Sequence, residues 1–248
     1  MARRATIIRQ EREQAEHILV LDAGNSLLKD RDPAKSTRGR SSIEAMNMMG
    51  YDAMTLGLLD LSSLKLDELR QRIGEAKFAV LSANAYVTGT EALLAEPYVV
   101  IAMAEHRVGI LGLTGAGLTS EVVATDPLEA AKKWIPKLQS QADMVIVLSH
   151  AGLNIDEEIA AQVPGIDVIV SGRNRMISEP LVSEGTGTIL LHADRATAGA
   201  AGERVGVAHL SFDKSGQLAG YNWRNIYLDS TYADDVEMNT WLETLKMR

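Results

Sequence analysis

The sequence predicts an α/β protein in which helices cover a sandwich of two sheets. Two short apolar runs rich in Val and Ile, Met144–Leu148 and Val168–Val170, flank a segment with helical spacing, Ile155–Val163, and Pro164 ends that helix. Because both runs are apolar throughout and a helix joins them, we interpret them as buried parallel strands. The last apolar runs of the chain indicate antiparallel strands and the earlier ones a mixed arrangement, so two sheets are expected.

In the first half of the chain, segments with helical spacing alternate with short apolar runs typical of strands. A polar, charged stretch that contains Pro33 predicts a loop over Leu28–Arg40. The helices expected in this half are Ala2–Glu16, Ser42–Met49 and Leu66–Ile73, and the strands are His17–Leu21, Ala53–Leu56 and Phe78–Ser82.

The second half begins with an expected hairpin and closes with a helix. Asp126 and Pro127 are the cap and first turn of a predicted helix. No linker, repeat or low-complexity segment interrupts the pattern, so we predict a single domain over residues 1–248. The predicted elements are the hairpin Tyr98–Ala104 with Arg107–Leu113, the helix Leu128–Gln139, the unit described above, the strands Thr188–His192, Arg204–Phe212 and Tyr221–Leu228 with a turn at Asp213–Gly216, and the helix Asp235–Lys246.

Composition restricts the possible partners. The net charge is −8, which argues against a nucleic acid or an anionic membrane surface as partner. The chain has no cysteine, so thiolate metal sites and disulfides are excluded. No apolar run approaches the roughly 18 residues of a membrane helix, and no apolar stretch follows the first arginines as in a signal peptide. We therefore expect a cytoplasmic protein from the sequence as written.

Polar residues follow both strands of the strand–helix–strand unit. Ser149 and His150 end the first strand, and Ser171–Arg175 follows the second. Ligands of open α/β sheets bind beyond the carboxyl ends of the strands, so we expect any functional site there. The glycines of Gly112–Gly117 lack the spacing of a dinucleotide-binding loop, and we interpret that stretch as a chain reversal.

Four segments in this order resemble the metallophosphatase domain of the 5′-nucleotidase family, within the calcineurin-like metallophosphatases. They read LVLDAGN at Leu19–Asn25, EAMNMMGYDAMTLG at Glu44–Gly57, VLSHAG at Val147–Gly152 and PGIDVIVSGRNR at Pro164–Arg175. The resemblance implies a four-layer α/β/β/α sandwich of two mixed sheets flanked by helices. It also implies hydrolysis of phosphate esters, as in nucleotide catabolism, at a pair of divalent metals that activate water.

Compared position by position with the family motifs, most metal ligands are replaced. The bridging Asp of the family motif LDAGD corresponds to Asn25, and the Asn-His-Glu of GNHE corresponds to Leu58, Leu59 and Asp60. The His of LSH is kept as His150. The two His of GHSH correspond to Arg173 and Arg175, which stay protonated and offer no lone pair to a metal. The family's first motif, Asp-x-His on a strand ahead of the first helix, has no match in the printed sequence.

Two hypotheses therefore stand side by side. In the first, the domain lacks the two-metal activity and needs no cofactor, Leu58 and Leu59 plug the former metal cavity, and the domain serves as an assembly or anion-binding module. The module would use Arg173, Asn174, Arg175 and Asn25 to bind phosphate or another small anion, and would form a homo-oligomer. In the second, His150, Asn25 and Asp60 rebuild a Zn, Mn or Fe site with arginine clamps, and His150 and Asp60 are the catalytic candidates. The arginines have a simpler interpretation, in which they are solvated or paired with Asp22, Asp30 or Asp60.

Overall fold

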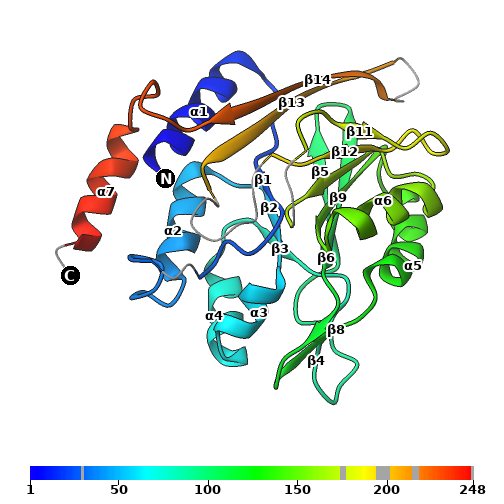
Figure 1. Ribbon diagram of the computed structural model, residues 1–248, viewed down its shortest axis with the longest axis horizontal. Helices are drawn as coiled ribbons and strands as arrows, with labels where there is room; N and C mark the ends of the chain where they lie inside the picture. The colour runs from blue at the N-terminus through cyan, green and yellow to red at the C-terminus, as the bar shows by residue number, and fades with distance from the viewer. Residues whose placement is uncertain (29–30, 174–176, 194–201, 214–217, 247–248) are drawn as a thin grey trace.

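The computed structural model describes residues 1–28, 31–173, 177–193, 202–213 and 218–246. Helices gather on two opposite sides of the central strands, and the last hairpin crosses one end of the molecule (Figure 1). The elements, in chain order, are α1 Ala2–Gln14, β1 Leu21–Asp22, α2 Arg40–Met49, β2 Ala53–Thr55, α3 Leu58–Ser63, α4 Leu66–Glu75, β3 Ala79–Leu81, β4 Ala85–Val87, β5 Tyr98–Met103, β6 His106–Thr114, β7 Gly117–Leu118, β8 Val122–Ala124, α5 Pro127–Gln139, β9 Met144–His150, α6 Leu153–Gln162, β10 Val168–Ser171, β11 Leu181–Val182, β12 Ile189–Leu191, β13 Arg204–Phe212, β14 Leu218–Tyr227 and α7 Val236–Lys246.

Two sheets form the centre of the fold. The larger has the strand order β11-β12-β10-β9-β6-β5, with four parallel strands between antiparallel edges, and is therefore mixed. The smaller has the order β1-β2-β3, and its strands are parallel. The predicted unit of two parallel strands around a helix is confirmed, since β9 and β10 pair in parallel with Val168 opposite Ile146.

Three apolar cores separate four layers, as alternation along each strand requires. On β9, Ile146 and Leu148 face the smaller sheet, whereas Val145 and Val147 face α5 and α6. On β2, Ala53 belongs to the core between the sheets, and the next residue, Met54, packs with α2 and α4. The order is therefore helices, smaller sheet, larger sheet, helices, which confirms the predicted α/β/β/α sandwich.

Several predicted elements need correction. The strand expected at His17–Leu21 is only β1, because the residues before Leu21 form no ladder. Residues 58–63, for which no helix was predicted, form the short helix α3. The strand β12, expected to be antiparallel, pairs in parallel with β10. The chain also forms β4, β7, β8 and β11, which were not predicted.

Other predictions are confirmed. The strands β5 and β6 form the expected antiparallel hairpin, as do β13 and β14. The predicted turn of that second hairpin lies, from residue 214 on, outside the described residues. At the start of α5, the carboxylate of Asp126 accepts the N–H of Leu128 at 2.8 Å, as predicted for a cap.

The first helix connects the last helix to the last hairpin. The helix α1 packs beside α7 (Figure 1). On its other side the buried carboxylate of Glu11 accepts two hydrogen bonds from Arg224 of β14, at 2.7 and 2.9 Å, with His209 of β13 at 3.6 Å. This ion pair fixes the first helix to the last hairpin.

In the described part of the chain, no helix combines the length and the apolar character needed to cross a membrane.

Candidate functional site

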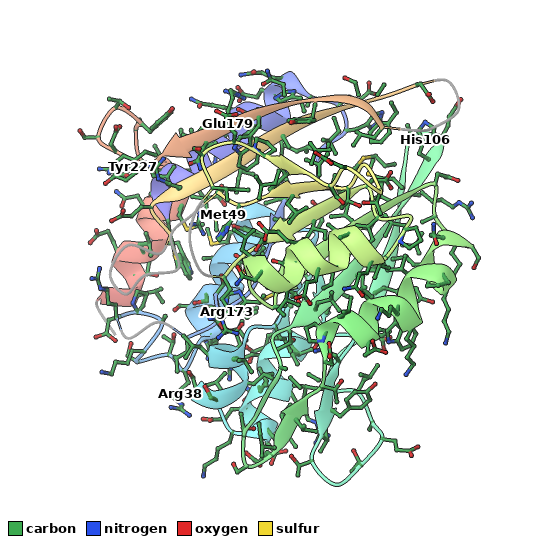
Figure 2. The ribbon with its side chains drawn as sticks, turned by 45° about the vertical axis from the view of Figure 1, so that its right-hand side comes forward. Arg38, Met49, His106, Arg173, Glu179 and Tyr227 are labelled. Carbon is green, nitrogen blue, oxygen red and sulfur yellow. The ribbon has the colours of Figure 1, made fainter. Side chains whose placement is uncertain are left out.

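The carboxyl ends of strands from both sheets meet at one place. The loop after β1 contacts the start of α3 after β2, the end of β9 and the end of β10 through the hydrogen bonds and close approaches described below. Figure 2 shows Arg173, just after β10, between the part of the molecule that carries α2, α3 and α4 and the part that carries α5 and α6. This convergence is where the sequence predicts the site.

Three glycines allow the loops to approach one another. A Cβ on Gly24, whose φ is +96°, would lie 3.1 Å from the side chain of His150. A Cβ on Gly57 would lie 2.1 Å from Oδ1 of Asn25, and one on Gly172 only 2.2 Å from the carbonyl oxygen of Ala23. The contacts at Gly57 and Gly172 are too short for a side chain unless neighbouring atoms move, and at Gly24 the contact is tight and the positive φ disfavours any other residue.

We expect Gly172→Ala to destabilise the protein by about 1–3 kcal/mol, because its methyl group meets backbone that must move. Urea unfolding would measure the change. Gly74→Ala is the matched control, since nothing lies within 4 Å of its Cβ and α4 gains helix propensity, so its stability should be equal or slightly higher. Equal stabilities for Gly172→Ala and the wild type would contradict the close approach of β10 to the β1 loop.

His150 is buried at the end of β9. Its Nδ1 lies 2.7 Å from the carbonyl oxygen of Ala23. A carbonyl oxygen only accepts, so Nδ1 carries a proton, and whenever the ring is neutral Nε2 is its acceptor nitrogen. The same bond ties the end of β9 to the loop after β1, and so joins the two sheets at the site.

Asp60 joins the loop after β1 to the start of α3 through hydrogen bonds. Its side chain is buried, and it accepts the backbone N–H groups of Asn25 at 2.8 Å, Gly57 at 2.9 Å and Leu27 at 3.0 Å. Burial raises the pKa of Asp60 to about 6, the three N–H donors lower it, and the nearby charge of Asp22 raises it further. The carboxylate thus caps α3 and holds the loop after β1.

The other polar candidates also have partners within the protein. The amide oxygen of Asn25 accepts the N–H of Leu59 at 2.9 Å. The two carboxylate oxygens of Asp22 accept the N–H of Gly24 and the hydroxyl of Ser26, at 2.9 and 2.8 Å. Among the described residues, no group of three or more His, Cys, Asp or Glu side chains is placed to hold a metal ion.

Arg173 lies half-buried against Gly115, between β6 and β7; the stretch interpreted from sequence as a chain reversal is, up to Thr114, the end of β6. The Nη1 of Arg173 is 2.8 Å from the position that a Cβ on Gly115 would occupy. Within the described residues no carboxylate pairs with Arg173, since Asp22 and Asp60 accept from other groups, so the expected ion pair with either does not form; that Arg173 is solvated stays a prediction. Asn174, Arg175 and Asp30 lie outside the described residues.

Two buried polar networks below the site were missed by sequence reasoning. Thr114, at the end of β6, donates its hydroxyl to the carbonyl of Leu56 at 2.8 Å and receives that of Ser82, also at 2.8 Å. Asp156 of α6 accepts the hydroxyl of Ser149 at 2.5 Å. The available signal was the polar residue that ends each apolar run, at Leu81–Ser82, Leu113–Thr114 and Leu148–Ser149.

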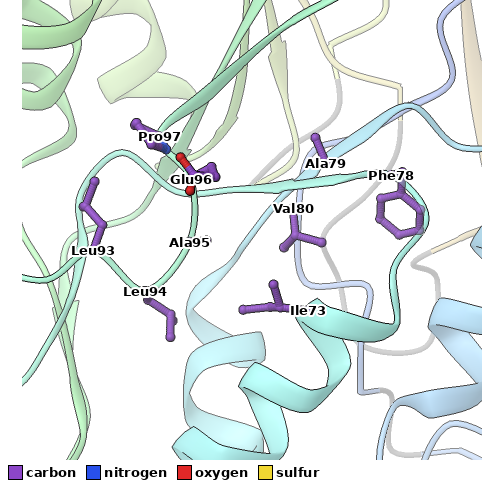
Figure 3. A pocket seen from close by; sticks show the side chains of 9 residues that line it. All are labelled: Ile73, Phe78, Ala79, Val80, Leu93, Leu94, Ala95, Glu96 and Pro97. Carbon is purple, nitrogen blue, oxygen red and sulfur yellow. The ribbon is translucent and has the colours of Figure 1, made fainter.

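A separate cavity of about 590 Å³ lies away from the strand ends, between β3, α4 and the segment before β5 (Figure 3). Apolar side chains line it, among them Ile73, Phe78, Val80 and Leu93, and Glu96 is the charged residue of its lining. It contains neither a histidine nor a cluster of carboxylates, so it offers no catalytic chemistry.

Comparisons with known proteins show relatives in sequence and in fold. The chain is 28% identical over 281 aligned residues, covering all of it and 46% of the relative, to the snake venom 5′-nucleotidase of Gloydius brevicauda. It superimposes with a TM-score of 0.84 and 25% identity on the 5′-nucleotidase precursor of Thermus thermophilus, covering 99% of this chain and 52% of that one. On the calcineurin-like phosphoesterase YfkN of Bacillus subtilis the TM-score is 0.82 at 22% identity, covering all of this chain and 88% of that one. No family model matches the sequence.

The layered sandwich with its convergent strand ends is the fold of the calcineurin-like phosphoesterases. Within that fold, the chain is homologous to the 5′-nucleotidases. It spans about half the length of the curated relatives it matches.

Proposed function

We propose that this domain binds an anion at the strand ends, where Arg173 is the cationic group, and does not hydrolyse phosphate esters through two metals. The observation that supports this proposal most directly is that side chains which could have bound metals already form hydrogen bonds within the protein. The amide oxygen of Asn25 and both oxygens of Asp60 accept backbone N–H groups, so their lone pairs serve the fold. A group held in this way serves as a structural link between loops.

The chemistry of the donor set does not fit a two-metal centre. Two divalent cations need several charged oxygens and neutral imidazoles aimed at a common point. Here Leu58 and Leu59 begin α3 at two positions where the family resemblance implies an amide and an imidazole, and Arg173 brings a permanent positive charge. A guanidinium binds carboxylate or phosphate oxygens directly and repels cations, which supports an anion as ligand.

A second candidate function is metal-dependent hydrolysis of a phosphate ester at a rebuilt site. The tautomer of His150 favours it, since a carbonyl bound at Nδ1 is the usual outer partner of a metal-binding imidazole and makes Nε2 the nitrogen that would ligate. In that case His150, Asn25 and Asp60 would hold one Zn, Mn or Fe ion and Arg173 would clamp the phosphate. The homology to 5′-nucleotidases supports the same chemistry.

Metal analysis of protein purified without chelator separates the two candidates. We expect substoichiometric zinc, manganese and iron, and no release of phosphate from AMP above that of a His150→Gln variant. Leu118→Ser, on an exposed residue of β7, controls for the effect of substitution itself. One or two equivalents of bound metal together with hydrolysis that His150→Gln abolishes would overturn the proposal and establish the second candidate.

A further inference from the structure

The guanidinium of Arg173 and the side chain of Leu58, at the start of α3, each approach a glycine of the same short strip, Gly115–Gly117. Arg173 covers the strip at Gly115, with Nη1 2.8 Å from the Cβ position, and Leu58 covers it at Gly117, with Cδ2 2.6 Å from the Cβ position. Neither glycine has a side chain that would keep these groups away. A cationic side chain therefore contacts the strip at Gly115, and an apolar one contacts it two residues further on, at Gly117.

The apolar side of this arrangement is open to solvent. Leu59, next to Leu58 in the first turn of α3, is 57% exposed, and Leu58 is half-buried. The N–H of Leu59 is held by the amide of Asn25, so the leucine is fixed in place although its side chain faces water. The exposed side chain of Leu59 and the half-buried side chain of Leu58 thus present apolar area at the start of α3 that a ligand could remove from water.

On the cationic side, no carboxylate of the described residues pairs with Arg173. Arg173 has no ion pair and no hydrogen bond within the described residues, whereas Arg38, Arg40, Arg107 and Arg224 each pair with a carboxylate. A half-buried guanidinium has given up part of its hydration, and an anion would restore those interactions.

We propose that the strip binds an anion that carries an aliphatic chain, with the charged head on Arg173 and the chain over Leu58 and Leu59. This inference rests on the proposed function, because it specifies the class of anion bound. An aliphatic chain fits better than a nucleobase, since these side chains include no aromatic ring on which a base would stack. A charged head and a chain are recognised independently, so each can be tested separately.

Titration calorimetry with octyl phosphate, inorganic phosphate, 1-octanol and AMP tests the proposal below the concentration at which octyl phosphate forms micelles. We expect octyl phosphate to bind about tenfold or more tightly than inorganic phosphate, because part of the chain leaves water. AMP should bind no better than inorganic phosphate. Arg173→Gln should abolish binding of both phosphates, and Arg173→Lys should restore part of it because the charge returns.

Leu59→Ser tests the apolar half of the proposal. It should lower the affinity for octyl phosphate severalfold and leave that for inorganic phosphate unchanged. The matched control is Leu118→Ser, a leucine that is 75% exposed and follows Gly117 in β7, where alternation turns it to the opposite face. Circular dichroism would check that each variant is folded.

The outcomes distinguish the two proposals. Equal affinities for octyl and inorganic phosphate, both lost in Arg173→Gln, would overturn the aliphatic preference and leave anion binding intact. Octyl phosphate and 1-octanol binding equally well, with no effect of Arg173→Gln, would overturn both. Metal-dependent hydrolysis of AMP would overturn the proposed function whatever octyl phosphate does.

Discussion

Asp60→Asn is expected to destabilise the protein by roughly 3 kcal/mol, although asparagine has almost the same shape. The carboxylate accepts three backbone N–H groups, two on one oxygen and one on the other. Asparagine keeps one acceptor oxygen and replaces the other with an NH₂ group, which must point at an N–H donor. At least one buried donor then loses its partner, and the loop after β1 loses its attachment to α3.

Urea unfolding of Asp60→Asn against the wild type measures this effect. Asp67→Asn is the matched control, because the Asp67 side chain is 98% exposed in the first turn of α4. Its unfolding free energy should change by less than about 0.5 kcal/mol. If Asp60→Asn unfolds at the same urea concentration as the wild type, the three hydrogen bonds do not hold the site together.

Elements with a strong local sequence pattern could be predicted, and elements that depend on contacts with distant residues could not. The unit β9–α6–β10 was predictable because its strands are apolar on both faces and its helix has a clear stop. The direction of β12 was not, since a three-residue apolar run carries no information about the neighbour it pairs with. The helix α3 has only six residues. The carboxylate of Asp60 accepts the N–H of Gly57 at its start and also that of Asn25 in the loop after β1. Sequence spacing cannot show such a tertiary cap.

For the site, the sequence predicted which residues come together but not how they interact. His150, Asn25, Asp60 and Arg173 all lie at the convergent strand ends, as expected from the ends of parallel strands. The engagement of Asp60 with three backbone N–H groups depends on loops more than 30 residues apart in the chain, and no motif encodes it. Their roles in binding or catalysis remain predictions.

Asp156→Asn is expected to act in the opposite direction and stabilise the protein above neutral pH. Burial raises the pKa of Asp156 to about 6, while the hydroxyls of Ser149 and Ser171 lower it. The hydrogen-bond donor to Asp156 is the hydroxyl of Ser149, which can rotate to donate or accept, so an amide can replace the carboxylate without leaving a fixed donor unpaired. The same substitution at two buried aspartates thus has opposite signs because their donors differ.

The pH dependence follows from proton binding. A carboxyl group whose pKa rises from 3.8 to about 6 on folding binds more protons in the folded chain, so stability falls as pH rises through that window. Above it the charged form is buried at a cost of up to about 3 kcal/mol, and below it the cost disappears. Asp60 titrates with the same sign. Asp156→Asn should therefore gain roughly 1–3 kcal/mol over the wild type near pH 8 and nothing near pH 4, as measured by urea unfolding at each pH. A constant difference between the two proteins across this range would mean that Asp156 keeps its ordinary pKa in the folded chain.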